Sequence, residues 1–177
     1  GVQCGIGPAI EDGFYYDVDV DRPISEDDLS TIEKEMKAVC KRNSQFTQEL
    51  WSKEKASAWF KERGQDYKVE LIDAIPGDEP LRMYWHGDWQ DLCRGPHLQN
   101  TGQGPADAFK LMKVAGAYWR GDERNPMMQR IYGTVWQTRD DLDQYLHRLE
   151  EAKKRDHRRL GQQLGLFLFH DYAPGAP

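Results

Sequence analysis

The sequence has few cysteines, no long apolar run and no excess of positive charge. Its three cysteines are widely spaced and odd in number, which excludes a disulfide framework and a paired metal knuckle. A reducing, cytoplasmic compartment is the expected setting. The longest apolar stretch, around residues 164–169, is too short to span a bilayer, and we expect neither a signal peptide nor a membrane partner. The net charge of −6 confines any RNA contact to local basic patches.

The composition favours a packed core. Charged residues make up 31% of the 177 positions, but Trp, Tyr and Phe make up 11%, which argues against disorder. The length suits one domain, or one domain with an appendage. The chain opens on Gly-Val-Gln-Cys without an initiator Met and ends in Ala-Pro-Gly-Ala-Pro, so we expect both ends to be cut or processed.

Capping patterns predict three helices. Ser25 with the acidic residue three positions later begins an amphipathic stretch that Asn43 closes, and Ser52 begins a second helix that Gly64 ends. Thr138 and Asp141 form a capping box that begins the last helix. That helix is expected to run for about 25 residues, or nearly 40 Å, and to act as a connector at its far end.

Alternating apolar residues predict strands between these helices. The segments are 14–20, 46–50, 83–85, 89–92, 109–114 and 129–136, with the third and fourth joined as a hairpin. Residues 68–75 mix the helix and strand periods, and residues 94–105 are predicted to be loop. Strands grouped apart from helices indicate an α+β fold with an antiparallel sheet and packed helices, followed by a long linker helix.

One segment, Asp91-Leu92-Cys93-Arg94-Gly95-Pro96-His97, carries the sharpest chemical signal. Its Gly-Pro turn can bring the Cys93 thiol and the His97 imidazole together. The pair could bind a metal, position water or a nucleophile, or be a buried cysteine with a turn histidine. Zinc needs three or four protein ligands, and the other histidines offer no matching pair, so we expect no metal beyond a partial zinc site.

Lys68, Tyr16 and a basic stretch are further candidates. Lys68 is either a surface lysine or a holder of a phosphate or ester oxygen. Tyr16 is either a half-buried strand aromatic or a ligand contact. Residues 109–136 interleave cations with aromatics, which suits single-stranded RNA ends but also an ordinary amphipathic sheet. The basic residues between 153 and 159 form either a solvated helix face or a contact to a tRNA backbone.

Together these segments resemble the threonyl-tRNA synthetase family, most closely its bacterial type. The resemblance runs nearly the full length with motifs in the family's order. It is carried by Ile6-Gly7-Pro8, 12–17, 91–97, 109–122, 129–134 and 149–158.

The resemblance implies an editing domain of the threonyl/alanyl-tRNA synthetase type at residues 1–137 with its N-terminal part missing. A linker helix would follow at 138–170, and the approach to an absent catalytic domain at 171–177. The family joins threonine to tRNA(Thr) using ATP, and this domain hydrolyses mischarged seryl-tRNA(Thr). A missing methyl group is worth only about 1–3 kcal/mol, so a second, hydrolytic sieve is needed.

The resemblance also implies roles for single residues. Catalytic roles fall to Lys68, which would hold the terminal ribose or orient the attacking water, to Cys93 and His97, which would position water, and to Asp91, which would contact the aminoacyl group. Tyr16 and Gly7 would bind substrate, with Gly7 allowing close backbone approach.

Partners and cofactors follow from the same family. The partner would be the acceptor end of tRNA(Thr), and the full-length parent would be a homodimer. No cofactor is expected for this segment, because ATP, Mg and Zn belong to the absent catalytic domain.

This chain departs from the family's pattern at one point. The family's His-x-x-x-His motif, expected upstream of Gly1, is absent. Two alternatives therefore stay open: a non-catalytic tRNA-binding or structural module that keeps the editing scaffold, and a zinc-binding domain built on Cys93 and His97.

Overall fold

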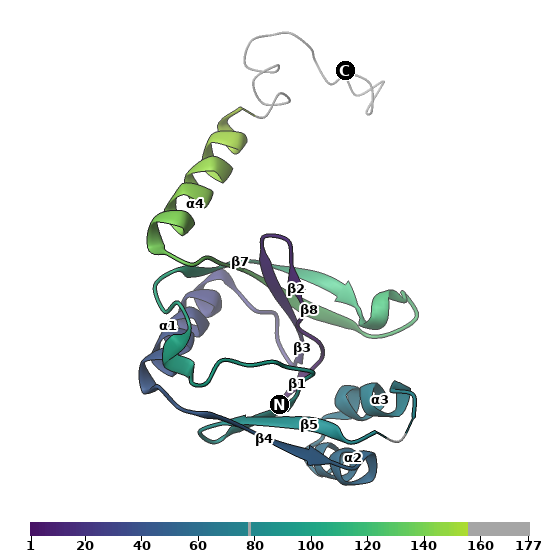
Figure 1. Ribbon diagram of the computed structural model, residues 1–177. Helices are drawn as coiled ribbons and strands as arrows, with labels where there is room; N and C mark the ends of the chain where they lie inside the picture. The colour runs from purple at the N-terminus through teal and green to yellow at the C-terminus, as the bar shows by residue number, and fades with distance from the viewer. Residues whose placement is uncertain (78, 156–177) are drawn as a thin grey trace, which may run out of the picture.

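The computed structural model describes residues 1–77 and 79–155 and confirms the α+β fold (Figure 1). None of the described helices is long and apolar enough to cross a membrane. Two 3-10 turns occupy Thr101–Gln103 and Trp119–Gly121. In chain order, the other elements are β1 Val2–Cys4, β2 Ala9–Ile10, β3 Gly13–Val20, α1 Glu26–Arg42, β4 Phe46–Trp51, α2 Lys53–Lys61, α3 Asp66–Ala74, β5 Leu81–His86, β6 Trp89–Leu92, β7 Phe109–Tyr118, β8 Met127–Val135 and α4 Arg139–Lys154.

The strands form two antiparallel sheets where the sequence predicted antiparallel pairing in one. The large sheet has the order β1-β3-β8-β7, with β2 also paired to β3, and the small sheet has the order β4-β5-β6. Figure 1 shows the small sheet beneath the large one, with α2 and α3 beside it. The predicted hairpin is confirmed as β5 and β6, whose last pair is His86 with Trp89.

Strand β3 supplies side chains to both faces of the large sheet. Successive residues of a strand point to opposite faces. Tyr15 and Asp17 therefore share one face, where Asp17 lies opposite Arg130 of β8. Tyr16 points to the other face, and its hydroxyl reaches Asp91 of β6 in the small sheet.

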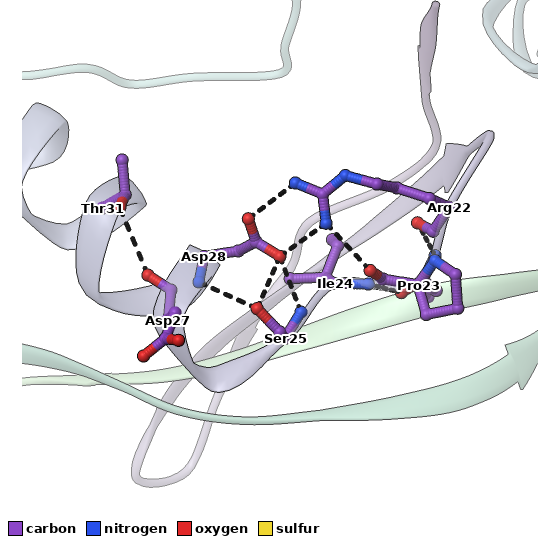
Figure 2. Close-up of polar contacts among 8 residues, drawn as sticks. Arg22, Pro23, Ile24, Ser25, Asp27, Asp28 and Thr31 are labelled. Carbon is purple, nitrogen blue, oxygen red and sulfur yellow. Dashed lines mark hydrogen bonds and ion pairs between the residues drawn. The ribbon is translucent and has the colours of Figure 1, made fainter.

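Helix α1 begins as its capping residues predict (Figure 2). The Ser25 hydroxyl accepts from the Asp28 N–H, and the Asp28 carboxylate accepts from the Ser25 N–H, which satisfies two groups at the helix start. Arg22 adds a two-pronged ion pair to Asp28 at 2.8 and 2.7 Å. The helix ends at Asn43, which adopts the left-handed conformation at φ 52°.

Helix α3 joins two hydrophobic clusters. The sequence left residues 68–75 undecided, and the structure makes 66–74 a helix. Its Ile72 is fully buried in the small-sheet core, whose other buried members come from β4, α2 and β5. Its Tyr67 packs against Trp119 and Met128 of the large sheet. Because α3 buries residues toward both sheets, it has no single apolar stripe, and the mixed periodicity follows from that.

Helix α4 starts at the large sheet and runs away from it (Figure 1). The Thr138–Asp141 capping box is confirmed. Leu142 is 1% exposed, and the Tyr145 ring lies 4.9 Å from that of Trp136, so the first turns are packed. The described helix has 16 residues. The predicted continuation to 170 and the segment 171–177 lie outside the described residues from 156 onward.

Candidate functional site

Three side chains from distant parts of the chain meet between the two sheets. The Lys68 ammonium of α3 lies 2.8 Å from Asp91 Oδ2 of β6. The Tyr16 hydroxyl of β3 donates to the same oxygen at 3.0 Å. The other oxygen, Asp91 Oδ1, accepts from the Leu92 N–H at 2.7 Å. We call Tyr16, Lys68 and Asp91 the polar trio.

The polar trio presents hydrogen-bond donors around one carboxylate. Lys68 is buried at 5% exposure, which excludes the surface-lysine alternative. The Asp91 side chain keeps 22% exposure. Burial, with the nearby Asp91 charge, raises the pKa of Tyr16 far above its usual value, so its hydroxyl stays neutral and donates. An ammonium held this way keeps further N–H donors, which can bind a polar substrate or stabilise a developing oxyanion.

Two residues of the N-terminal segment lie behind Tyr16. A side chain at Gly7 would collide with the Tyr16 ring, so only glycine fits there without moving the ring. The half-buried Cys4 thiol lies near the Tyr16 hydroxyl. Burial raises the pKa of Cys4, with opposing contributions from the nearby Lys68 and Asp91, so the thiol stays protonated at neutral pH.

Cys93 and His97 belong to the segment that follows β6 and its Asp91. The exposed Cys93 follows β6, and its sulfur accepts from the Gly95 N–H at 3.4 Å. The His97 ring stacks 4.1 Å from Tyr84 and 4.9 Å from Phe46. Gly95 has φ 67°, and a side chain there would collide with the Tyr84 hydroxyl, so glycine permits the loop to lie on Tyr84.

The His97 ring and the Asp91 side chain lie on one face of the small sheet. Tyr84 is the cross-strand partner of Asp91, so the two side chains lie on the same face, and His97 covers Tyr84. Within residues 1–77 and 79–155, neither Cys93 nor His97 forms a hydrogen bond with the polar trio. Partial burial lowers the pKa of His97, so its imidazole is neutral at neutral pH and can accept a proton or hold water.

A mostly apolar cavity lies elsewhere. It has a volume of about 940 Å³ and a mostly apolar lining from α1, β4, the β5–β6 turn and the facing ends of β7 and β8. Phe46 and His86 belong to its lining, but the polar trio does not. The polar trio is the candidate site, because buried charge and aligned donors converge there.

The basic and aromatic stretch of 109–136 is only partly available to RNA. Trp119 is 2% exposed and belongs to the core. Arg130 is engaged with the buried Asp17 at 2.7 and 2.8 Å. Lys113 lies over the Tyr132 ring at 5.0 Å, and Tyr118 is exposed. These contacts favour the amphipathic-sheet interpretation for most of the stretch.

No group of three or more His, Cys, Asp or Glu side chains in the described part of the chain is placed to hold a metal ion.

Sequence reasoning missed three residues around the site: Cys4, Tyr84 and Gln65, whose side chain joins β1 to α3. Only the alternation of Tyr84 with buried residues along its strand could have indicated its face.

Comparison with known proteins shows which family this chain resembles. Residues 81–132, which include Tyr84, Asp91, Cys93 and His97, match the family described as the threonyl and alanyl tRNA synthetase second additional domain. The chain is 59% identical over 174 residues to the threonine–tRNA ligase of Dinoroseobacter shibae. This chain is homologous to part of the bacterial threonine–tRNA ligases.

The threonine–tRNA ligases of Sinorhizobium fredii and Agrobacterium fabrum are each 58% identical over 175 residues. The alignments cover 98–99% of this chain but only 26–27% of each relative. The chain thus spans about a quarter of the length of these threonine–tRNA ligases. It corresponds to a segment that contains the second additional domain, as its motifs predicted.

Proposed function

We propose that this chain is the editing segment of a threonine–tRNA ligase and that it hydrolyses the ester of seryl-tRNA(Thr). The observation that carries the proposal is the polar trio, in which a buried ammonium and a neutral phenol converge on one carboxylate. It lies in a chain homologous to threonine–tRNA ligases over nearly all its length. The full-length protein would charge tRNA(Thr) with threonine, using ATP at its catalytic domain.

In this proposal the polar trio binds and orients the aminoacyl ester. Lys68 directs its ammonium toward the terminal ribose or the oxyanion that forms when water attacks the carbonyl. Asp91 orients Lys68 and Tyr16 and offers its remaining lone pairs to the α-ammonium of serine. Hydrolysis of an activated ester needs mainly water placement and charge stabilisation, which these groups supply without a covalent intermediate.

In the proposed site, Cys93 and His97 position water. The neutral His97 imidazole can accept a proton from the attacking water. Its stacking on Tyr84 fixes the ring plane, and Tyr84 lies opposite Asp91. The tRNA acceptor end would enter over the exposed Cys93 and His97, and the serine side chain would lie near the polar trio.

A chimaera tests the proposal. The matched segment of the Dinoroseobacter shibae ligase is replaced by this chain, and hydrolysis of seryl-tRNA(Thr) and threonyl-tRNA(Thr) is compared. We expect the seryl ester to be hydrolysed and the threonyl ester spared. Lys68→Met should slow hydrolysis about 100-fold, which corresponds to about 2.7 kcal/mol of transition-state stabilisation.

Aminoacylation with threonine is the control for folding of the chimaera, and Gln144→Ala on the exposed face of α4 is the matched control variant. Equal hydrolysis of both esters would refute the substrate assignment. Unchanged hydrolysis in both Lys68→Met and His97→Ala would refute the site. If the chimaera binds tRNA(Thr) but hydrolyses neither ester, the non-catalytic tRNA-binding module is the better description.

A further inference from the structure

The Gln65 side chain is used on a neighbouring strand rather than on its own helix. Gln65 is the N-cap of α3, yet its side chain makes no capping hydrogen bond. Its Oε1 accepts from the Cys4 N–H at 2.8 Å, and its Nε2 donates to the Val2 carbonyl at 2.9 Å. The amide thereby pairs with the edge of β1 that faces away from β3, as the backbone of another strand would.

The contact between β1 and α3 is reciprocal. The Gln3 side-chain oxygen accepts from the Asp66 N–H at 3.1 Å, so β1 satisfies a first-turn group of α3 that Gln65 leaves free. Three hydrogen bonds therefore join a three-residue strand to the start of a nine-residue helix. Both segments are short, so neither would hold this alignment by its own length.

Each side of this junction leads directly to the polar trio. On α3, Lys68 follows Gln65 by three residues, about one helical turn. On β1, the Cys4 thiol lies near the Tyr16 hydroxyl, and the chain continues to Gly7, which lies against the Tyr16 ring. The Gln65 amide thus sits between the segment that supports Tyr16 and the helix that carries Lys68.

Other contacts hold α3 against the two sheets. Ile72 packs in the small-sheet core by apolar burial, which is not directional. The Tyr67 hydroxyl donates to Asp19 of β3, and the Trp119 indole donates to Glu70. These contacts keep α3 on the large sheet when Gln65 is replaced, so the fold should survive while the spacing between β1 and α3 relaxes.

We propose that Gln65 is a positioning residue of the editing site, which sets the Lys68 ammonium relative to Tyr16 by pairing with β1. The inference rests on the proposed function for its catalytic consequence but not for its structural one. The pairing of the Gln65 amide with β1 matters because a displacement of about 1 Å at a catalytic group can cost on the order of 100-fold in rate.

The first experiment tests the contact between β1 and α3 in the 177-residue chain itself, without tRNA. Alkylation of each cysteine is followed by peptide mass spectrometry between pH 6 and pH 10, in the unsubstituted chain, Gln65→Ala, Gln65→Glu and the control Gln144→Ala. The groups that face Cys4 are Tyr16, Lys68 and Asp91. Gln65→Ala should speed alkylation of Cys4 about 5- to 10-fold and move the pH profile of that rate. The alkylation rates of Cys40 and Cys93 should stay within twofold of the parent, and the urea midpoint of unfolding should stay close to that of the parent.

Gln65→Glu separates the two hydrogen bonds. It keeps the acceptor for the Cys4 N–H but replaces the donor to the Val2 carbonyl by a second acceptor, so its effect should be intermediate. It also serves as the test variant if Gln65→Ala does not fold. Unchanged Cys4 reactivity, or equal acceleration at all three cysteines, would overturn the proposal, because the second result means general loosening.

The second experiment measures catalysis in the chimaera described above. Gln65→Ala should lower kcat for seryl-tRNA(Thr) hydrolysis about 10-fold and leave KM for the tRNA unchanged, since Gln65 lies behind the site. A change in KM alone would refute the positioning role. If the unsubstituted chimaera hydrolyses no ester, the proposed function fails, while the Cys4 measurement still decides whether Gln65 aligns β1 with α3.

Discussion

Two ion pairs lie close together in this molecule and differ in what surrounds them. Asp17 and Arg130 sit opposite each other on neighbouring strands, joined by two hydrogen bonds, with the guanidinium over the Tyr15 ring at 3.9 Å. Lys68 and Asp91 come from a helix and a strand of the small sheet and share one contact. The Asp17 side chain is 3% exposed, and that of Asp91 is 22% exposed.

The difference is between a pair closed off from solvent and a pair that the proposed function uses. The Asp17–Arg130 pair is bidentate, and its carboxylate is closed off from solvent, so it ties β3 to β8. The Lys68–Asp91 pair gains a third member, Tyr16, from the other sheet and remains open on one side. An ion pair that is open on one side can make a further contact to a substrate.

We call Asp17–Arg130 the closed pair and Lys68–Asp91 the open pair. The largest expected effect is on protein stability, when the closed pair is broken. Asp17→Ala leaves the Arg130 guanidinium partly buried without its partner, which should cost about 3–5 kcal/mol in the free energy of unfolding. Lys68→Met should cost about 1 kcal/mol or less, because methionine fills the buried space and the partly exposed Asp91 can hydrate. Urea unfolding of both variants gives the two values, and similar losses would remove the distinction.

A smaller effect is expected at Gly7, which lies against the Tyr16 ring beside the open pair. Gly7→Ala places a methyl group against the Tyr16 ring and should displace its hydroxyl from Asp91. Hydrolysis of seryl-tRNA(Thr) by the chimaera should fall about 10-fold, or about 1.4 kcal/mol. Gly1→Ala meets nothing within 4 Å and is the matched control. If Tyr16→Phe loses much less than Gly7→Ala, the hydroxyl is not the reason for the loss.

The smallest effect is the pH dependence set by two histidines, His86 of β5 and His97 of the loop after β6. Burial lowers the pKa of both His86 and His97 below the usual 6.5. The unfolded chain then binds more protons, so their contribution to stability is complete above pH 6.5 and is lost as pH falls through the folded pKa values. His86→Gln with His97→Gln should flatten this slope in urea unfolding between pH 7 and 5, and a retained slope would assign it to other groups.

Much of the fold could be predicted because local chemistry decides it. Ser25, Ser52, Thr138 and Asn43 each mark a helix end by satisfying backbone groups within a few residues, and all four are confirmed. Helix α3 could not be predicted, because it packs on both sheets and so carries no single apolar stripe.

The candidate site was harder to predict because its contacts are long-range. Tyr16 and Asp91 are 75 residues apart, and nothing local indicates that they meet. Their prediction came from the family resemblance. Cys4 and Gln65 were missed, since the first offers only a half-buried thiol and the second bonds to backbone groups, which leave no side-chain pattern in the sequence.

Strand β3 carries both ion-pair networks in consecutive residues. Tyr15 and Asp17 serve one face of the large sheet, and Tyr16 serves the other. Insertion or deletion of one residue before Tyr15 would reverse every side chain of the strand and break both networks in one step. Point substitutions on one face leave the other in place. The strand's length is therefore far less free to vary in evolution than the identity of its individual side chains.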